Sequence, residues 1–251
     1  MTWVLLRGLT REARHWGGLP AQLKLQLTNT PAAGDVLTPD LPGNGVFHQQ
    51  TSPPSVPAMV DFVRSQLQAQ GRQAPWNLLA MSLGGMVATD WAQRYPKEVA
   101  RLVLVNTSMR PFSGFTQRLR PGNWFTLAAL AARWQDADHA ERLIHYLTCN
   151  NTAARADDIA AWIHIRKTAP VSAANSWHQL RAAAQFSCAA QAPQCPTLLL
   201  SSRYDRLVNA NCSQHLANAW KTPHKIHPWA GHDLPHDDPD WLCQQVSHWL
   251  T

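Results

Sequence analysis

The sequence has few charged residues, and its basic residues are not gathered into clusters. Only 15% of the 251 residues are charged while 45% are hydrophobic, a balance that excludes a disordered chain and favours a compact globular protein. The 22 Lys and Arg residues against 16 Asp and Glu give a net charge of +6, which could suit nucleic acid, an anionic membrane or an acidic protein. A nucleic-acid groove normally requires clustered basic residues, whereas the only adjacent pair here is Arg166-Lys167. We therefore expect no nucleic-acid partner.

The five cysteines form no pattern typical of a disulfide framework or a cysteine zinc site, because they are odd in number and widely spaced without a C-x-x-C pair. No targeting or membrane segment is expected either. The apolar run 3–6 ends at Arg7, which is too short for a signal-peptide core, and the weakly polar stretch 125–132 is far shorter than a membrane span. The sequence therefore predicts a cytoplasmic protein with reduced thiols and no membrane partner.

The chain does contain an alternation of short apolar runs with helical segments. Apolar residues spaced three and four apart predict amphipathic helices between the runs, and this order predicts an α/β fold with a mostly parallel sheet of about six strands. The expected strands are residues 3–6, 36–38, 77–80, 102–105, 197–200 and 225–227. The expected helices of this core are residues 12–27, 56–70, 83–95, 210–220 and 240–250.

One long interval interrupts this alternation. No strand-like run occurs between positions 108 and 195, and the composition shifts to Ala, Arg, Trp and His. An all-helical insertion in an α/β chain indicates a lid over a site, although its helices could also be ordinary structural cover. Residues that suit helix N-caps predict four successive helices there, at Asn123, Asp136, Asp157 and Ser172. The expected organisation is a core in two parts with a lid between them, divided as 1–108, 109–195 and 196–251.

A serine follows the third expected strand at a sharp strand-to-helix turn. The segment reads Ala80-Met81-Ser82-Leu83-Gly84, and such a turn requires small residues two positions before and after the serine, here Ala80 and Gly84. The turn exposes the serine hydroxyl above the sheet, and the following helix points free N–H groups and its positive dipole end at the same place. Ser82 is therefore a candidate nucleophile, although alanine replaces the first glycine of the usual G-x-S-x-G.

A serine hydroxyl needs a base to remove its proton, and the base needs a carboxylate to orient it. Asp205 follows the fifth expected strand and His232 follows the sixth. Because parallel strands end at one edge of a sheet, the three side chains can converge there. The sequence thus predicts a catalytic triad of Ser82, Asp205 and His232.

These motifs and two loops resemble those of the α/β-hydrolase superfamily over nearly the whole chain. Asp40-Leu41-Pro42-Gly43-Asn44-Gly45 is similar to the D-x-P-G-x-G loop of many members, and Leu6-Arg7-Gly8-Leu9-Thr10 resembles their H-G-x oxyanion loop, with Arg7 in place of histidine. The resemblance implies an α/β-hydrolase fold that lacks the usual first two edge strands. It also implies an oxyanion hole formed by the backbone N–H groups of Leu9 and Leu83.

The implied reaction is acyl transfer to water, without a cofactor. Ser82, deprotonated by His232, attacks a carbonyl while Asp205 orients the imidazole, and water then cleaves the acyl-enzyme. Some relatives carry the acid after the preceding strand, where this chain has Asn106, which favours Asp205. A serine nucleophile excludes the chemistry of relatives that dehalogenate alkyl halides with an aspartate. The expected activity is that of a serine carboxylesterase, and the same site could also cleave thioesters, lactones, amides or carbon–carbon bonds.

A zinc site is an alternative interpretation of the C-terminal histidines. His232 and His236 lie four residues apart among three aspartates, and on a helix this spacing could bind zinc. Pro235 lies between them and disfavours a continuous helix. We therefore predict no metal site at this pair.

Tryptophans offer candidate substrate contacts. Trp124, Trp134, Trp162 and Trp177 lie in the expected lid and could line an acyl pocket, with Trp16 near the oxyanion loop bordering the same cleft. Each could equally be ordinary helix-packing core, since aromatic residues dominate buried area.

The expected lid also carries most of the excess positive charge. Nine basic residues against five acids between positions 110 and 181 give a net +4 of the total +6. A basic helical lid resembles the small carboxylesterases that cleave the methyl ester of pimeloyl-acyl carrier protein, so an acidic acyl carrier protein is a candidate partner. The charges could instead form an ordinary solvated surface.

A different class of function uses the same scaffold without catalysis, as a ligand-binding or interaction module. Such proteins usually lose part of the triad. Because this chain retains a serine, an aspartate and a histidine in the expected order, the sequence favours an enzyme.

Overall fold

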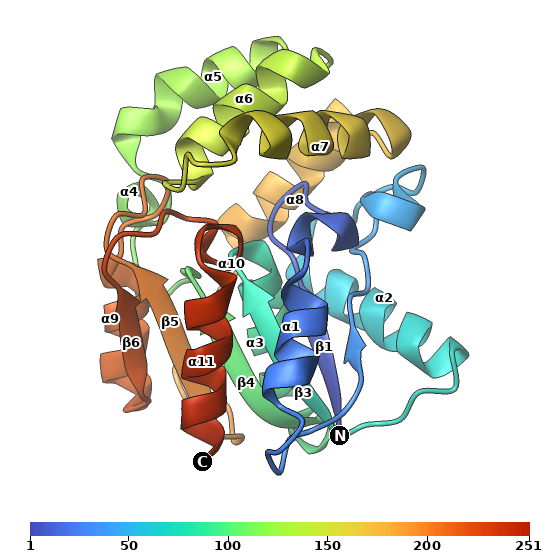
Figure 1. Ribbon diagram of the computed structural model, residues 1–251, viewed down its shortest axis with the longest axis vertical. Helices are drawn as coiled ribbons and strands as arrows, with labels where there is room; N and C mark the ends of the chain where they lie inside the picture. Colours follow the sequence, from blue (N-terminus) through green and yellow to red (C-terminus); the bar gives the residue numbers. More distant parts are fainter.

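The computed structural model describes all 251 residues, and its centre is a six-stranded parallel sheet (Figure 1). The strand order is β2-β1-β3-β4-β5-β6, and every neighbouring pair is parallel. All six predicted strands are confirmed, and five of them extend one to three residues beyond the apolar runs that predicted them. The strands are β1 (Thr2–Leu6), β2 (Val36–Leu37), β3 (Trp76–Met81), β4 (Val99–Val105), β5 (Thr197–Ser202) and β6 (His224–His227).

The alternating side chains of the strands divide the core into two layers. Val4 and Leu6 of β1 belong to the larger cluster of buried apolar residues, while Trp3 and Leu5 belong to the smaller cluster on the other face. Every residue of β3 is buried, as expected for a strand covered on both faces. The central strands β1 and β3 are therefore mostly apolar at consecutive positions, because both of their faces are covered, whereas the edge strand β6 has two exposed residues.

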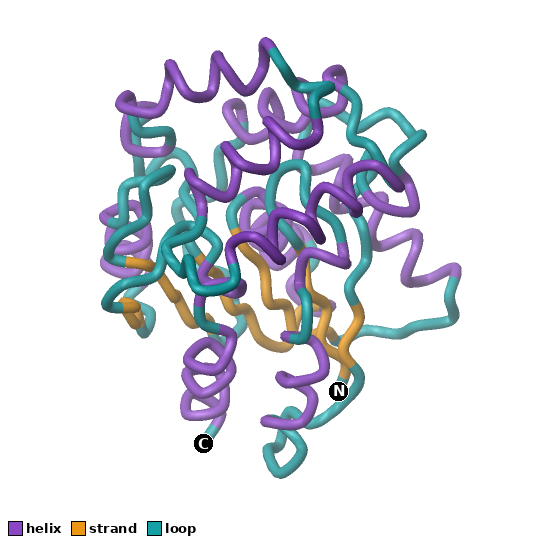
Figure 2. Tube along the Cα trace, turned by 45° about the horizontal axis from the view of Figure 1, so that its top comes forward, coloured by secondary structure: helices purple, strands orange, loops and turns teal.

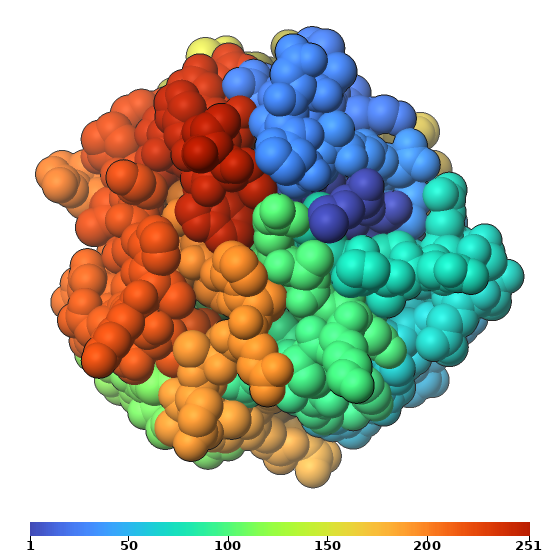
Figure 3. Space-filling view, turned by 90° about the horizontal axis from the view of Figure 1, so that it is seen from below, coloured from blue at the N-terminus to red at the C-terminus, as the bar shows by residue number.

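Helices cover both faces of the sheet. The larger cluster lies beneath α2 (Val56–Ala69), α3 (Leu83–Arg94) and α9 (Asn211–Trp220). The smaller cluster lies beneath α1 (Leu19–Gln26) and α11 (Pro239–Leu250), which pack side by side near the two ends of the chain (Figure 3). Short elements complete the core: η1 (Ala13–Trp16), η2 (Gly45–Phe47), η3 (Pro96–Glu98) and α10 (Leu234–Asp237).

One predicted core helix is wrong in its extent. The segment 12–27 forms two pieces, η1 and α1, rather than one helix. Gly17 and Gly18 separate them, and Gly17 takes a φ of +54°, in the left-handed region that glycine adopts without a steric penalty. The apolar spacing continued across these glycines and concealed the break.

The interval between β4 and β5 is helical, as predicted. It contains α4 (Phe115–Arg118), η4 (Pro121–Asn123), α5 (Trp124–Ala132), α6 (Ala137–Thr148), α7 (Arg155–Thr168) and α8 (Ala173–Gln185). We call residues 109–195 the helical insertion. Helices α5, α6 and α7 lie beyond the carboxyl ends of the strands (Figures 1 and 2). None of the helices is both long and apolar enough to cross a membrane.

Two of the four predicted N-caps bond as expected, and one is wrong. The side chains of Asp136 and Ser172 accept hydrogen bonds from backbone N–H groups in the first turns of α6 and α8. Asn123 occupies the N-cap position of α5 without a capping bond. Helix α7 begins at Arg155, so Asp157 lies inside its first turn. An acid in the first turn interacts favourably with the positive end of the helix dipole. Aspartate is therefore common both there and at the N-cap, and the sequence did not distinguish the two positions.

The helical insertion packs in two parts. Helices α5, α6 and α7 share a small apolar cluster of their own, which includes Leu130 and Ile165. Helix α8 instead joins the larger core of the sheet through Ala182 and, just beyond its end, Phe186. Three helices therefore form an outer layer, while α8 is fastened to the body of the protein.

Candidate active site

Ser82 occupies the turn between β3 and α3, at the carboxyl edge of the sheet. Its φ is +53°, a left-handed conformation that costs energy for a residue with a side chain and persists only where the surroundings hold it. The end of β4 supplies that support. The Ser82 N–H donates to the Val105 carbonyl at 3.0 Å, and the Ser82 carbonyl accepts from the Thr107 hydroxyl at 2.8 Å. The predicted sharp turn at Ser82 is therefore present.

Glycines let the first loop approach this serine. A Cβ added to Gly84 would overlap the carbonyl oxygens of Leu6 and Arg7, and one added to Gly8 would lie 3.1 Å from the Ser82 Cβ. The loop after β1 therefore lies directly against the turn. No hydrogen bond within the protein engages the N–H group of Leu9 or Leu83, so both donors are free for an external acceptor.

Asp205 and His232 form a buried hydrogen-bonded pair. The two side chains are 2% and 4% exposed, and 2.7 Å separates Asp205 Oδ2 from His232 Nδ1. The other carboxylate oxygen, Oδ1, accepts from the N–H groups of Leu207 and Val208 at 2.8 and 2.9 Å. Burial opposes the charged imidazole, but the charge and hydrogen bond of Asp205 outweigh it and raise the pKa of His232 above its usual value. The pair can therefore hold a proton on the histidine.

Asn106 fastens the histidine loop to the sheet, a role that the sequence did not reveal. This buried residue follows β4, and its Nδ2 donates to the carbonyls of Gly231 and His232 at 3.2 and 2.8 Å. The same amide group donates to the Ser202 hydroxyl and accepts from the Ser202 N–H. A carboxylate at this position could accept but could not donate to those carbonyls, so the amide suits the position.

Arg7, which replaces the usual histidine of the first loop, forms a buried ion pair. Its Nη1 and Nη2 atoms donate to the two carboxylate oxygens of Asp233 at 3.0 and 2.6 Å, and its guanidinium lies 4.7 Å from the centre of the Trp16 ring. Burial opposes the charged carboxylate, but Arg7 outweighs it and lowers the pKa of Asp233 to about 2. The bidentate pair therefore ties the first loop to the residue after His232.

Removing Arg7 is expected to destabilise the protein. Arg7→Met leaves the Asp233 charge buried without a partner, which costs about 3–5 kcal/mol of unfolding free energy. Because Asp233 titrates at about 2 rather than 3.8, its contribution is present above pH 3.8 and disappears as the pH falls toward 2. Urea denaturation at pH 7 measures the loss, and Arg203→Met, at an exposed arginine, is the control. A loss no larger than that of the control would contradict the assignment.

A second buried ion network joins the first loop to the helical insertion. Glu141 of α6 accepts from Arg11 Nη1 at 2.7 Å and from Arg166 Nη1 of α7 at 2.9 Å. The Arg11 guanidinium also stacks on Trp162, 4.4 Å from the ring centre. Three separate chain segments therefore share one buried carboxylate.

Gln179 of α8 connects the two loops that follow β1 and β2. Its Oε1 accepts from the Thr10 N–H at 2.8 Å, and its Nε2 donates to Asn44 Oδ1 at 2.8 Å and to the Ser52 hydroxyl at 2.9 Å. Gln179 is fully buried. The conformation of the first loop therefore depends on a residue about 170 positions later in the sequence.

The structure does not gather the five candidate tryptophans around one pocket. Trp134 and Trp162 lie in the apolar cluster of α5, α6 and α7, and Trp16 lies in the smaller core of the sheet. Trp124 and Trp177 are 45% and 63% exposed. A cleft of about 490 Å³ opens near the segment after Asp205, lined by residues that include Arg120, Asn123, Tyr146, Arg206 and Asn209.

An all-parallel sheet with a serine at a left-handed strand-to-helix turn is the architecture of the α/β hydrolases. A family model described as the alpha/beta hydrolase fold matches residues 16–239, and the chain belongs to this family.

Two curated relatives extend the comparison. A "Pimeloyl-[acyl-carrier protein] methyl ester esterase" of Aromatoleum aromaticum is 37% identical over 105 residues, which span 42% of this chain and only 36% of that protein. A Klebsiella pneumoniae protein named "Putative carbamate hydrolase RutD" is 30% identical over 205 residues, which span 78% of this chain and 74% of that protein. The fold and these relatives together support a hydrolase.

Solved structures show the same fold at low sequence identity. The enol-lactonase of Burkholderia xenovorans has a TM-score of 0.78 and 16% identity, over 99% of this chain and 90% of that chain. A thermophilic esterase of Thermogutta terrifontis has a TM-score of 0.71 and 21% identity, over 100% and 89%. At these identities the likeness concerns the fold alone.

Proposed function

We propose that the protein is a serine esterase in which Ser82, His232 and Asp205 hydrolyse a carboxylic ester through an acyl-enzyme. The observation that carries the proposal is the buried hydrogen bond of 2.7 Å between His232 and Asp205, at the same edge of the sheet as the strained Ser82 turn. Because the buried carboxylate accepts this hydrogen bond, the imidazole proton stays on His232 Nδ1. The lone pair on Nε2 is then free to take a proton from the Ser82 hydroxyl.

In the proposed reaction, His232 Nε2 takes the Ser82 Oγ proton as Oγ bonds to the ester carbonyl carbon. The N–H groups of Leu9 and Leu83 donate to the resulting oxyanion. The carbon–oxygen bond to the alcohol then breaks, and His232 returns the proton to the departing alcohol. Water repeats the sequence on the acyl-enzyme, with His232 as base, and releases the carboxylic acid and free Ser82.

We further propose that the helical insertion is a lid that shapes the acyl-binding space. Helices α5, α6 and α7 lie beyond the carboxyl ends of the strands. Ser82 follows β3 and His232 follows β6 at this edge, and the three helices have a separate apolar cluster. Closed sites of this kind exclude water and bury the substrate. The five free cysteines of the chain suit the reducing cytoplasm, which we propose as its location.

Labelling with a serine-reactive phosphonate tests the proposed nucleophile. Turnover of short-chain p-nitrophenyl esters is expected to fall in proportion to phosphonate bound, and peptide mass spectrometry should locate the label on Ser82. Esterase turnover that survives complete labelling would contradict the proposal. A chain that neither turns over esters nor reacts with the phosphonate would be a binding module on a hydrolase scaffold.

The pH dependence of turnover should report the shifted pKa of His232. As the base, His232 must be neutral, so kcat/KM is expected to rise with pH along a single acid limb. Because Asp205 raises the pKa of His232 above 6.5, the midpoint of that limb should lie above pH 6.5. Initial rates with a neutral ester measure this midpoint between about pH 5 and pH 9, a range that extends about two pH units to either side of the usual pKa of histidine. A midpoint below 6.5 would contradict the geometry.

An ester carried on an acidic acyl carrier protein is a second candidate substrate. The 37% match to an esterase of that kind favours it, and five of the nine basic residues of the insertion are exposed and pair with no acid. These five are Arg110, Arg120, Arg155, Lys167 and Arg181.

Salt dependence tests the acyl carrier protein as partner. If exposed positive charge steers the carrier, its association should slow about tenfold or more as salt is raised from low to near-molar concentration. Arg155→Glu combined with Lys167→Glu should weaken binding. Arg203→Glu should not, because Arg203 is an exposed arginine outside the helical insertion. Stopped-flow or surface-binding measurements give the rates. An association rate that does not change with salt concentration, or no binding at all, would leave the small-molecule ester as the substrate.

A further inference from the structure

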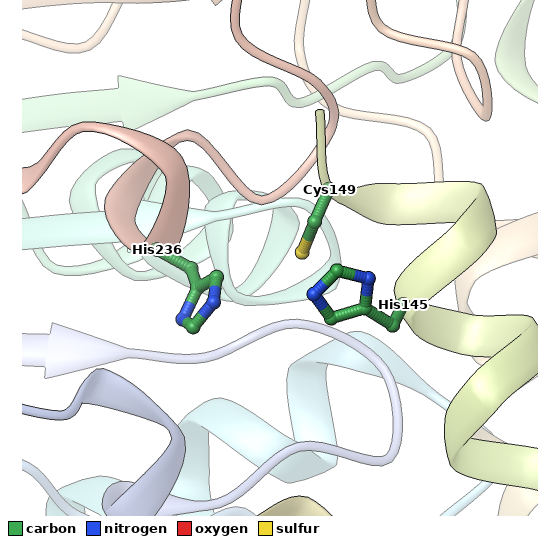
Figure 4. A group of neighbouring side chains, drawn as sticks. All are labelled: His145, Cys149 and His236. Carbon is green, nitrogen blue, oxygen red and sulfur yellow. The ribbon is translucent and has the colours of Figure 1, made fainter. Parts of the chain in front are cut away.

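Three side chains that can ligate a metal meet where the helical insertion contacts the core. His145 and Cys149 come from the last turn of α6 and its C-cap, four residues apart and therefore on one face of the helix. His236 comes from α10 in the core. The ligating atoms of the three all lie within 4.8 Å of one another, and Figure 4 shows the sulfur and both imidazole rings converging.

His145 in this cluster is buried without hydrogen bonds. Its side chain is 0% exposed, and neither ring nitrogen has a hydrogen-bond partner. A buried polar group in that state costs about 1–3 kcal/mol unless a partner satisfies it. Cys149 beside it is also fully buried. The site therefore presents an unsatisfied imidazole that faces a thiol and a second imidazole.

Asp158 of α7 adds a fourth group. Its Oδ2 lies 3.1 Å from His236 Nε2 and 3.6 Å from His145 Nε2. The two imidazole nitrogens and the thiol sulfur therefore form the compact group, and the Asp158 carboxylate lies beside both imidazoles.

We propose that His145, Cys149, His236 and Asp158 bind one divalent transition-metal ion of the zinc type. Nitrogen and sulfur ligands suit Zn²⁺ or Co²⁺, whereas Mg²⁺ and Ca²⁺ prefer oxygen ligands. On binding, the Cys149 S–H bond breaks, a metal–sulfur bond forms and the proton leaves to solvent, without any electron transfer. Four protein ligands leave no open position, so the ion is structural rather than catalytic.

The proposed ion joins the outer helices to the segment that carries the proposed base. Cys149 and His145 end α6, Asp158 lies in α7, and His236 follows His232 by four residues. His232 itself is engaged by Asp205, so the metal site and the proposed triad use separate side chains. A bound ion would therefore hold α6 and α7 against the core without entering the reaction.

Cobalt absorption tests the site directly. Chelator-treated, reduced protein titrated with Co²⁺ alone should develop a thiolate-to-cobalt charge-transfer band that saturates at one equivalent. The Cys149→Ser variant should lose that band. His236→Gln should weaken binding by at least about 10–100-fold, the loss that follows even when only an outer partner of a ligand is removed. The matched control, Cys188→Ser, removes another buried thiol and should keep the band.

Thermal unfolding gives a second readout that is independent of activity. Zn²⁺ at about 100 times its dissociation constant should raise the unfolding temperature of the parent and of Cys188→Ser by about 5–10 °C. The shift should vanish in Cys149→Ser and shrink in His236→Gln. A parent protein without the charge-transfer band, or a band that persists in Cys149→Ser, would overturn the proposal.

Discussion

Ser82→Ala is expected to lower kcat for a p-nitrophenyl ester by about four to six orders of magnitude. Without Oγ there is no nucleophile for the carbonyl carbon, and the residual rate comes from water within the remaining site. The Ser82 hydroxyl makes no hydrogen bond within the protein, and alanine has the same Cβ and therefore the same backbone strain as serine at a φ of +53°. The variant should therefore fold with unchanged stability while losing its activity.

The matched control is Ser55→Ala. Ser55 is exposed and its side chain caps no helix, so its replacement should leave kcat unchanged. Unfolding midpoints in urea, measured beside the rates, separate lost chemistry from lost structure. A Ser82→Ala protein that retains turnover within tenfold of the parent would remove Ser82 from the mechanism.

The strands and the serine turn were predictable because their signals are local. A buried parallel strand is apolar at consecutive positions, and the turn at Ser82 requires small residues nearby in the sequence, as Ala80 and Gly84 show. The proximity of Asp205 and His232 was predictable for a related reason. Each follows a strand, and parallel strands bring their ends to one edge.

The contacts that hold the candidate site together were not predictable, because each joins distant parts of the chain. Arg7 pairs with Asp233 across 226 positions, and Asn106 holds the His232 carbonyl across 126. Arg7 appeared in the sequence only as a departure from a histidine motif. Its role became visible when the fold placed a buried carboxylate opposite it.

The helical insertion shows the same limit in its packing. Helix periodicity predicted four helices, but it could not show that α8 belongs to the core while α5, α6 and α7 form a separate layer. Likewise, the sequence suggested His232, four residues away, as the partner of His236 in a zinc site. In the fold it meets His145 and Cys149, which lie about 90 positions earlier.

The hydrogen bonds of Asp205 make one substitution especially informative. Its Oδ1 accepts two backbone N–H groups, from Leu207 and Val208, and only Oδ2 faces His232. In Asp205→Asn the amide oxygen must stay toward those two donors, so the amide NH₂ faces His232 Nδ1. That nitrogen must then accept, which moves the imidazole proton to Nε2 and removes the lone pair that would deprotonate Ser82.

Asp205→Asn is therefore expected to lower kcat by about four orders of magnitude with little change in KM, because the substrate contacts remain. The same change removes the charge that raises the pKa of His232, so the acid limb of the remaining activity should move to lower pH. Asp35→Asn, at an exposed carboxylate that pairs only with Lys24 and Arg72, should match the parent in both respects. Turnover of Asp205→Asn within tenfold of the parent would show that His232 takes its tautomer from another group, and the acid of the proposed triad would have to be sought elsewhere.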